Sequence, residues 1–196
     1  YNNLPKINGK QTISVWAKYT STPPSTPVLV SIGAPAGNAI QLLFSSGKPT
    51  VGKYGGTILV QSPTIPSPNV WHYYSYTYDG VSHKLYVDGL LKATSSVAPN
   101  TGTPTIFNIG RSFPGTFHFN GYIDELRIWN RTLNPDEILL HNRSNLYFYG
   151  FNERSFFINQ TKNDGNGLDD GTYTYFAYAS DLSENFASTE TRTITI

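Results

Sequence analysis

The chain has 196 residues and a formal net charge of +1, and 14% of its residues are charged and 14% aromatic. Together with 17 glycines and 13 prolines, this balance is typical of a β-rich domain with many turns, and it excludes a disordered or helical chain. The Lys and Arg residues are scattered singly, so we expect no binding to nucleic acid.

Cysteine is absent, which excludes disulfides, thiolate zinc sites and cysteine nucleophiles. No apolar run approaches the roughly 18 residues that a membrane span requires, so we expect no membrane insertion in this segment. The chain begins at Tyr1 and contains no Met, which is typical of a piece of a longer polypeptide whose targeting segment lies elsewhere.

The first 70 residues predict short strands separated by proline-rich loops. Alternation of apolar and polar residues, together with β-branched and aromatic residues, favours strands. The segments TSTPPSTP and SPTIPSPN contain three prolines each and predict exposed loops, because proline removes the donors that a sheet needs. The strands are expected at residues 11–18, 28–32, 39–45, 50–54 and 57–61.

The stretch from residue 71 to residue 143 carries the strongest turn and cap signals. Asp79-Gly80 and Asp88-Gly89 stand between alternating runs, where glycine permits the left-handed backbone of a hairpin. Residues 135–143 predict the one convincing helix: Asn134 is its cap, Pro135 suits its first position, and Glu137 completes a capping box.

Four motifs of this stretch follow one another in order: WHYYSYTYDG, LYVDG, IG and FNGYIDELRIWNRTL. This pattern resembles the laminin G-like domains of the concanavalin A-like jelly-roll superfamily, over about residues 11–145. The resemblance implies an all-β fold, an antiparallel concanavalin A-like β-sandwich (jelly roll), in a domain of residues 1–145. Alternation places in its buried interior the residues Trp16, Trp71, Leu85, Ile123 and Leu126.

Residues 146–196 form a different unit, with three strands expected at 146–161, 172–180 and 189–196. They resemble the closing half of an immunoglobulin-like or fibronectin-like domain of microbial surface proteins. A small three-stranded C-terminal β unit would leave an apolar face and two edges exposed. We therefore expect it to be covered by the jelly roll, or by strand addition to its open edges from a neighbouring chain, as self-association, or from a flanking segment.

Catalysis is not expected. Jelly-roll glycosidases need two carboxylates facing one glycosidic bond, and their Glu-x-Asp-x-x-Glu pattern is absent. The four histidines are scattered, and no hydrolase motif accompanies them. A glycoside hydrolase is therefore the weakest functional alternative.

Two groups of residues are candidate ligand contacts. The loop of residues 111–117 carries Arg111, Phe113 and Phe117, which have no packing reason to lie in a loop. Tyr74 and Tyr76 alternate on one face of a strand, where rings can stack on sugars. For these two tyrosines, ordinary core packing is the stronger interpretation.

Asp124 and three Asn-x-Ser/Thr sequons complete the candidate sites. In similar jelly rolls a structural calcium often lies at the aspartate matching Asp124, but the amino-terminal aspartate that would join it has no match here. We therefore expect Asp124 to cap backbone amides, with calcium binding as the alternative and no cofactor required. The sequons predict possible glycosylation at the surface residues Asn130, Asn142 and Asn159.

The resemblance implies a non-catalytic extracellular recognition or adhesion module of a larger cell-surface or secreted protein. Its partner would be a glycan or a cell-surface protein. The alternative is a structural subunit of an extracellular filament, sheath or surface layer, completed by strands from its neighbours.

Overall fold

The computed structural model describes residues 4–20, 26–34, 38–112, 115–148, 154–158, 171–175, 178–180, 186–188 and 190–195. By its internal contacts the chain divides into two compact units, residues 1–142 and residues 143–196. Among the described residues, no helix is long and apolar enough to cross a membrane.

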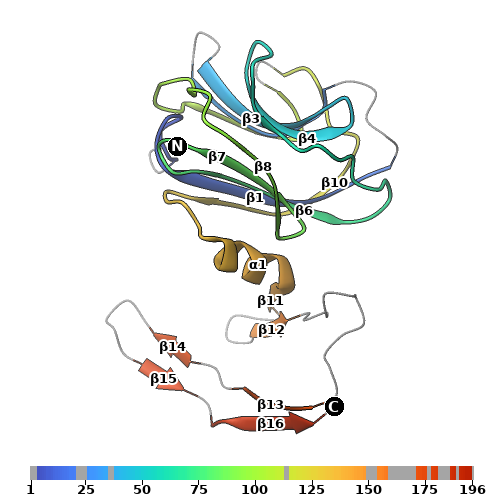
Figure 1. Ribbon diagram of the computed structural model, residues 1–196, viewed down its shortest axis with the longest axis vertical. Coiled ribbons are helices and arrows are strands. Elements are labelled where there is room, and N and C mark those ends of the chain that lie inside the picture. The colour runs from blue at the N-terminus through green and yellow to red at the C-terminus, as the bar shows by residue number, and fades with distance from the viewer. Residues whose placement is uncertain are drawn as a thin grey trace. The chain divides into compact units, whose positions relative to one another are not determined.

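The first unit is a sandwich of two five-stranded antiparallel sheets (Figure 1). This confirms the predicted all-β concanavalin A-like architecture. Sheet A has the order β10-β1-β6-β7-β8 and sheet B the order β5-β4-β3-β2-β9. The strands of sheet A are β1 (Gln11–Tyr19), β6 (His72–Tyr78), β7 (His83–Val87), β8 (Leu90–Ser95) and β10 (Gly121–Trp129). Those of sheet B are β2 (Val28–Ala34), β3 (Asn38–Ser45), β4 (Lys48–Lys53), β5 (Ile58–Gln61) and β9 (Ile106–Ile109).

The core lies between the two sheets and follows the alternation of the sequence. Side chains that face it include Val15, Tyr74, Tyr76 and Leu85 from sheet A and Ile32, Leu42, Phe44 and Val51 from sheet B. Of the predicted interior residues, Leu85 is fully buried, while Ile123 and Leu126 are partly buried and pack against this core. The prediction for Trp71 is wrong: its side chain is 40% exposed, because Trp71 precedes β6 on the face of sheet A that points away from the core.

A second, smaller apolar cluster covers part of that outer face of sheet A. Tyr73, Tyr86, Leu133 and Ile138 form it, with Trp16 and Trp129 packed against them. Trp16 is therefore packed as an interior residue, but on the opposite side of the sheet from the main core. The helix α1 (Pro135–Arg143) supplies Ile138 to this cluster.

The predicted capping box of α1 is confirmed. The Glu137 backbone N–H donates to Asn134 Oδ1 at 2.9 Å, and the Asn134 N–H donates to Glu137 Oε2 at 2.8 Å. Arg131 adds two hydrogen bonds to the Glu137 carboxylate, at 2.7 and 3.0 Å. These bonds, with Arg131 the larger cause, lower the pKa of Glu137 to about 2, so α1 starts at a carboxylate that stays charged.

The second unit corrects the expectation of three long strands. Its described residues form six short strands in three antiparallel pairs: β11 (Ser144–Phe148) with β12 (Arg154–Ile158), β13 (Thr172–Tyr175) with β16 (Arg192–Thr195), and β14 (Tyr178–Ser180) with β15 (Phe186–Ser188). The range 146–161, expected as one strand, is longer than an ordinary strand, and its described residues belong to two strands, β11 and β12, which pair antiparallel. The immunoglobulin-like resemblance, and what covers the apolar side chains of this unit, stay predictions.

Three histidines of the first unit lie in contrasting environments. His83 is fully buried: Tyr76 Oη lies 2.8 Å from its Nδ1 and its Nε2 lies 2.7 Å from the Val97 carbonyl oxygen. Burial lowers the pKa of His83, and burial followed by the nearby Arg127 charge lowers that of His141. His72 Nδ1 lies 2.7 Å from Asp88 Oδ2, and this hydrogen bond raises the pKa of His72.

We expect these environments to give opposite pH dependences of stability. The His72 contribution is complete below its unfolded pKa of about 6.5 and is lost as pH rises through the higher folded value. His83 and His141 act in reverse, because below pH about 6.5 the unfolded chain takes up protons that the folded chain does not. An NMR titration of the ring Cε1–H signals should place His72 above, and His83 and His141 below, the ordinary pKa. The reverse order would contradict these environments.

Candidate functional site: a groove on the outer face of sheet B

A hollow in the described part of the first unit lies on the face of sheet B that points away from the core. It has a volume of about 390 Å³, which is within the range of small-molecule sites in proteins. Its floor is formed by β2, β3 and β4, and its walls by the β4–β5 turn on one side and by Thr26 and Phe117 on the other.

Strand register brings the floor residues together from distant parts of the chain. Val28, Leu43 and Thr50 are successive cross-strand partners and make one row. Gln41, Gly52 and Ile58 make the next row. Gly52 contributes no side chain to this row, and an added Cβ would lie 3.1 Å from the Thr57 carbonyl oxygen, so a larger residue would crowd the floor beside the β4–β5 turn.

The floor combines apolar side chains with fixed polar groups. Thr50 Oγ1 accepts from Gln61 Nε2 at 2.9 Å and donates to the Lys48 carbonyl oxygen at 2.9 Å. Gln41 Nε2 donates to Ser31 Oγ at 3.3 Å, and Gln41 is only 5% exposed. No described residue donates to the Gln41 amide oxygen, which can therefore accept a hydrogen bond from a bound molecule.

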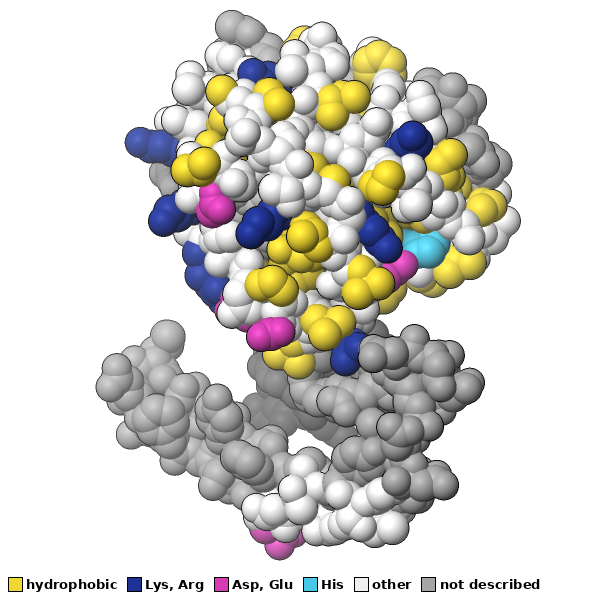
Figure 2. Space-filling view, viewed as in Figure 1, with side chains coloured by type: hydrophobic (Ala, Val, Ile, Leu, Met, Phe, Trp, Pro, Cys, Tyr) yellow, Lys and Arg dark blue, Asp and Glu magenta, His cyan; other side chains and the backbone are white. Residues whose placement is uncertain are grey.

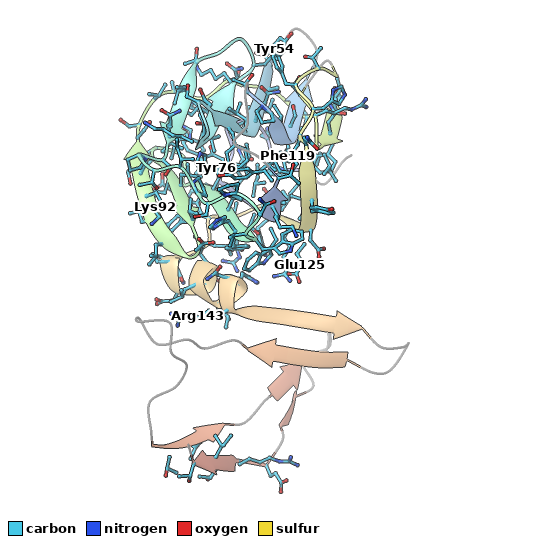
Figure 3. All side chains as sticks on the ribbon, turned by 90° about the vertical axis from the view of Figure 1, so that its right-hand side faces the viewer. Tyr54, Tyr76, Lys92, Phe119, Glu125 and Arg143 are labelled. Carbon is cyan, nitrogen blue, oxygen red and sulfur yellow. The ribbon has the colours of Figure 1, made fainter. Side chains whose placement is uncertain are left out.

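Two exposed aromatic rings stand at the rim. Tyr54 is 38% exposed in the β4–β5 turn, at the end of the sandwich away from α1 (Figure 3). Phe117 is 50% exposed at the opposite wall, and its φ of 52° is uncommon for a bulky residue. A hydrogen bond of 3.0 Å from the Val28 N–H to the Phe117 carbonyl oxygen fixes this segment beside β2. A bulky residue whose backbone is in the left-handed region is typical of functional loops.

The predicted ligand residues divide between this groove, the surface and the core. Phe117 lines the groove. Arg111 is exposed but does not line it, and Phe113 lies outside the described residues. Tyr74 and Tyr76 are fully buried between the sheets, as Figure 3 shows for Tyr76, so the prediction that they contact a ligand is corrected: they have no exposed surface.

Sequence reasoning missed Gln41, Gly52 and Tyr54. The sequence carried a local signal for Gly52 and for Tyr54. Gly52 interrupts a strand, which is typical of a close approach to the backbone, and Tyr54 is followed by two glycines with φ of 97° and 99° that leave its ring in a tight, exposed turn. Nothing local marked Gln41, because only the pairing of β3 with β2 and β4 places it on the floor.

Asp124 caps the backbone at a bulge. Its Oδ1 accepts from the Glu125 N–H at 2.7 Å, and Glu125 has a φ of 45° beside the register shift between β1 and β10. Among the described residues, no three His, Asp or Glu side chains are close enough together to hold a metal ion. Calcium binding at Asp124 therefore stays a prediction of the resemblance alone.

The three sequons differ in accessibility. Asn130 is exposed directly after β10. Asn142 lies in the last turn of α1 and is half-buried, with its Oδ1 buried. Asn159 lies outside the described residues.

Comparison with known proteins now identifies the family. A laminin G-type family model, described as the concanavalin A-like lectin/glucanases superfamily, matches residues 2–139. The chain belongs to this superfamily. No match was found among the curated proteins.

Solved structures with the same fold include domains of glycan-processing enzymes. Domain 4 of the GH43 extracellular arabinanase AbnA from Geobacillus stearothermophilus, in complex with arabinotriose, is 20% identical with a TM-score of 0.59 over 70% of this chain and 68% of that chain. The CBM40 of the Ruminococcus gnavus IT-sialidase, bound to α2,3-sialyllactose, is 18% identical with a TM-score of 0.58 over 68% and 83%. Trypanosoma rangeli sialidase in complex with the inhibitor DANA is 19% identical with a TM-score of 0.53 over 67% of this chain but 22% of that chain. At these identities the likeness shows the fold.

Proposed function

We propose that residues 1–142 form a non-catalytic carbohydrate-binding module of a larger extracellular or cell-surface protein, and that the groove on sheet B holds the sugar. The observation that carries this proposal is the pair of exposed rings, Tyr54 and Phe117, on opposite walls of a hollow with a polar floor. Aromatic rings stack on the apolar faces of pyranose rings, while amide and hydroxyl groups hold sugar hydroxyls.

The composition of the groove supports binding without hydrolysis. Hydrolysis of a glycosidic bond requires two carboxyl groups on either side of it. None of the described residues that line the groove is Asp or Glu. The solved structures named above lend further support, because two were determined with oligosaccharides bound. Adhesion of the larger protein to a glycan-bearing surface is the role that such a module would serve.

Affinity measurements on groove variants test the proposal. Glycan-array screening followed by calorimetry should identify an oligosaccharide ligand for the wild-type protein. Tyr54→Ala and Phe117→Ala should each weaken its binding about threefold to tenfold, the loss expected for one stacked ring. Gly52→Val should weaken binding more strongly, because the new side chain would occupy the floor and crowd the Thr57 carbonyl oxygen of the β4–β5 turn.

Val81→Ala is a matched control, because Val81 is 71% exposed and does not line the groove. We expect it to leave affinity unchanged. If the three groove variants bind every retained glycan as tightly as the wild type does, the groove is not the site. Release of reducing sugar by the wild-type protein would contradict the non-catalytic role.

Self-association through open sheet edges is the alternative that a structural subunit would require. The edge strand β8 exposes Leu90 by 60% and Leu91 by 53%. It also carries Lys92 at the sheet edge (Figure 3), and an edge lysine opposes strand addition. We therefore favour the binding module over the filament subunit.

A further inference from the structure

A row of three side chains crosses the outer face of sheet A, on the opposite face of the sandwich from the groove. Lys18 pairs with Tyr122 across β1 and β10, and Ala17 pairs with His72 across β1 and β6. Continuing that second register places Trp71 opposite Lys18. The three neighbouring strands, seen side by side in Figure 1, thus present Tyr122, Lys18 and Trp71 as one row, which we call the platform.

The platform is built around the Lys18 ammonium. Lys18 Nζ lies 4.8 Å from the centre of the Tyr122 ring and 5.5 Å from the centre of the Trp71 ring. The two ring centres are 6.3 Å apart, with their planes tilted by 53°. Cation–π attraction to both rings holds the ammonium in place and removes much of the freedom that a lysine side chain ordinarily has.

The rings are uncovered although other aromatic residues of the same face are packed. Trp16 and Tyr73 lie beneath Leu133 and Ile138 of the α1 segment. Tyr122 is 57% exposed and Trp71 40% exposed. Figure 2 shows other exposed hydrophobic side chains on the first unit, interspersed with Lys and Arg. At the platform, two exposed aromatic rings and a lysine ammonium group lie together.

The ammonium lacks an anionic partner among the described residues. Lys18 has no ion pair and no side-chain hydrogen bond there, although an ammonium group has three donors. Asp124, the next outward residue of β10, pairs with Trp16 and accepts a hydrogen bond from the Glu125 N–H. The platform therefore offers a fixed positive charge between two apolar ring surfaces, with its donors open to a ligand.

We propose that the platform is a second binding site, specific for a sugar residue that carries a carboxylate, such as a uronic acid. Its carboxylate would accept hydrogen bonds from Lys18 Nζ, while the apolar face of its pyranose ring would lie on Trp71 or Tyr122. A neutral sugar meets only the rings, and an acidic peptide meets only the charge. The site does not depend on the groove, since the two lie on opposite sheets.

Trigalacturonic acid and its methyl ester are the probes that separate charge from ring stacking. The two share the same rings and differ in the carboxylate charge. In the wild-type protein the acid should shift the Trp71 indole N–H signal, identified by its loss in Trp71→Phe, and the ester should bind about tenfold more weakly. Raising the ionic strength should weaken binding of the acid.

Variants then locate the site. Lys18→Gln and Trp71→Ala should each lower the affinity for the acid about tenfold, Lys18→Arg should largely retain it, and the groove variant Tyr54→Ala should leave it unchanged. All of these side chains are at least partly exposed, and circular dichroism checks that each variant is folded. Tetraglutamate should bind about tenfold more weakly than trigalacturonic acid.

Four outcomes would overturn the proposal: no binding of the acid at millimolar concentration, equal binding of the ester, unchanged affinity in Lys18→Gln and Trp71→Ala, or equal binding of tetraglutamate. Loss of acid binding in Tyr54→Ala alone would move the acidic sugar to the groove. That last result would support the proposed module function while rejecting the platform, so the two proposals fail separately.

Discussion

Replacing Gly121 by alanine is expected to lower the free energy of unfolding by about 3 kcal/mol, near the upper end of what overpacking usually costs. Gly121 opens β10 and pairs with Tyr19 of β1. An added Cβ would overlap the Lys18 carbonyl oxygen and would lie 2.8 Å from Phe119 Cε1 and 2.9 Å from Tyr19 Cα. Two of these three atoms belong to the β1 backbone, so β10 would have to move away from β1.

Gly80→Ala is the control for this substitution. Gly80 has a φ of 100°, and nothing lies within 4 Å of an added Cβ, so alanine there costs only the left-handed conformation, about 1 kcal/mol. Urea unfolding of both variants measures the difference. Equal losses of stability would mean that the close approach of β1 and β10 at Gly121 is not needed for the fold. A movement of β10 would also displace Tyr122 from Lys18, so Gly121→Ala should weaken binding at the platform as well.

Features set by neighbouring residues could be predicted from the sequence. The capping box of α1 joins Asn134 and Glu137, three residues apart, and both of its hydrogen bonds form. Asp88-Gly89 has the two positive φ values, 53° and 77°, that a tight hairpin between β7 and β8 requires. In each case the interacting atoms lie within one turn, so no knowledge of the fold is needed.

Which outer face is covered could not be predicted. Alternation correctly separates Tyr74 and Tyr76 from Trp71 and Tyr73, because successive side chains of a strand point to opposite faces. It does not show that the α1 segment covers Tyr73 and leaves Trp71 exposed. The predicted burial of Trp71 was wrong for this reason, whereas the burial of Tyr74 in the main core agrees with the stronger interpretation of its sequence.

The groove was only partly predictable, because it is formed by register. Phe117 was found from the composition of its loop, whereas Gln41 and Gly52 face each other across β3 and β4 only in the folded sheet. The strands of the second unit were also hard to predict, because they too depend on strand pairing. Described residues of the range 146–161 belong to both β11 and β12, and the alternation of either strand alone does not show that the two pair.

Thr12 connects sheet A to the segment that leads into α1 through two hydrogen bonds of its hydroxyl group. Thr12 Oγ1 donates to the Arg131 carbonyl oxygen at 2.8 Å and accepts from the Leu133 N–H at 2.9 Å. These backbone groups lie 119 and 121 residues away in the sequence. Thr12 is fully buried and Leu133 is 2% exposed, so water cannot easily replace the hydroxyl.

Replacing Thr12 by valine, which has nearly the same shape, should therefore lower the free energy of unfolding by about 2–4 kcal/mol. The packing is retained, but the buried Leu133 N–H and the partly buried Arg131 carbonyl oxygen lose their partner, and an unsatisfied buried group costs about 1–3 kcal/mol. Thr12→Ser keeps the hydroxyl and should lose much less stability. Thr132→Val should cost about 1 kcal/mol, because Thr132 Oγ1 makes one bond, to the Tyr78 carbonyl oxygen at 2.8 Å, at a half-buried position.

Urea unfolding measures the three losses, and hydrogen exchange shows where they act. In Thr12→Val the amides of residues 133–141 should exchange faster than those of the central strand β6, because α1 depends on this connection and β6 on the main core. If Thr12→Val and Thr12→Ser are equally stable, the hydroxyl does not hold α1 on the sheet. In that case the apolar contacts of Leu133 and Ile138 with Tyr73 and Tyr86 would alone keep this part of the outer face covered.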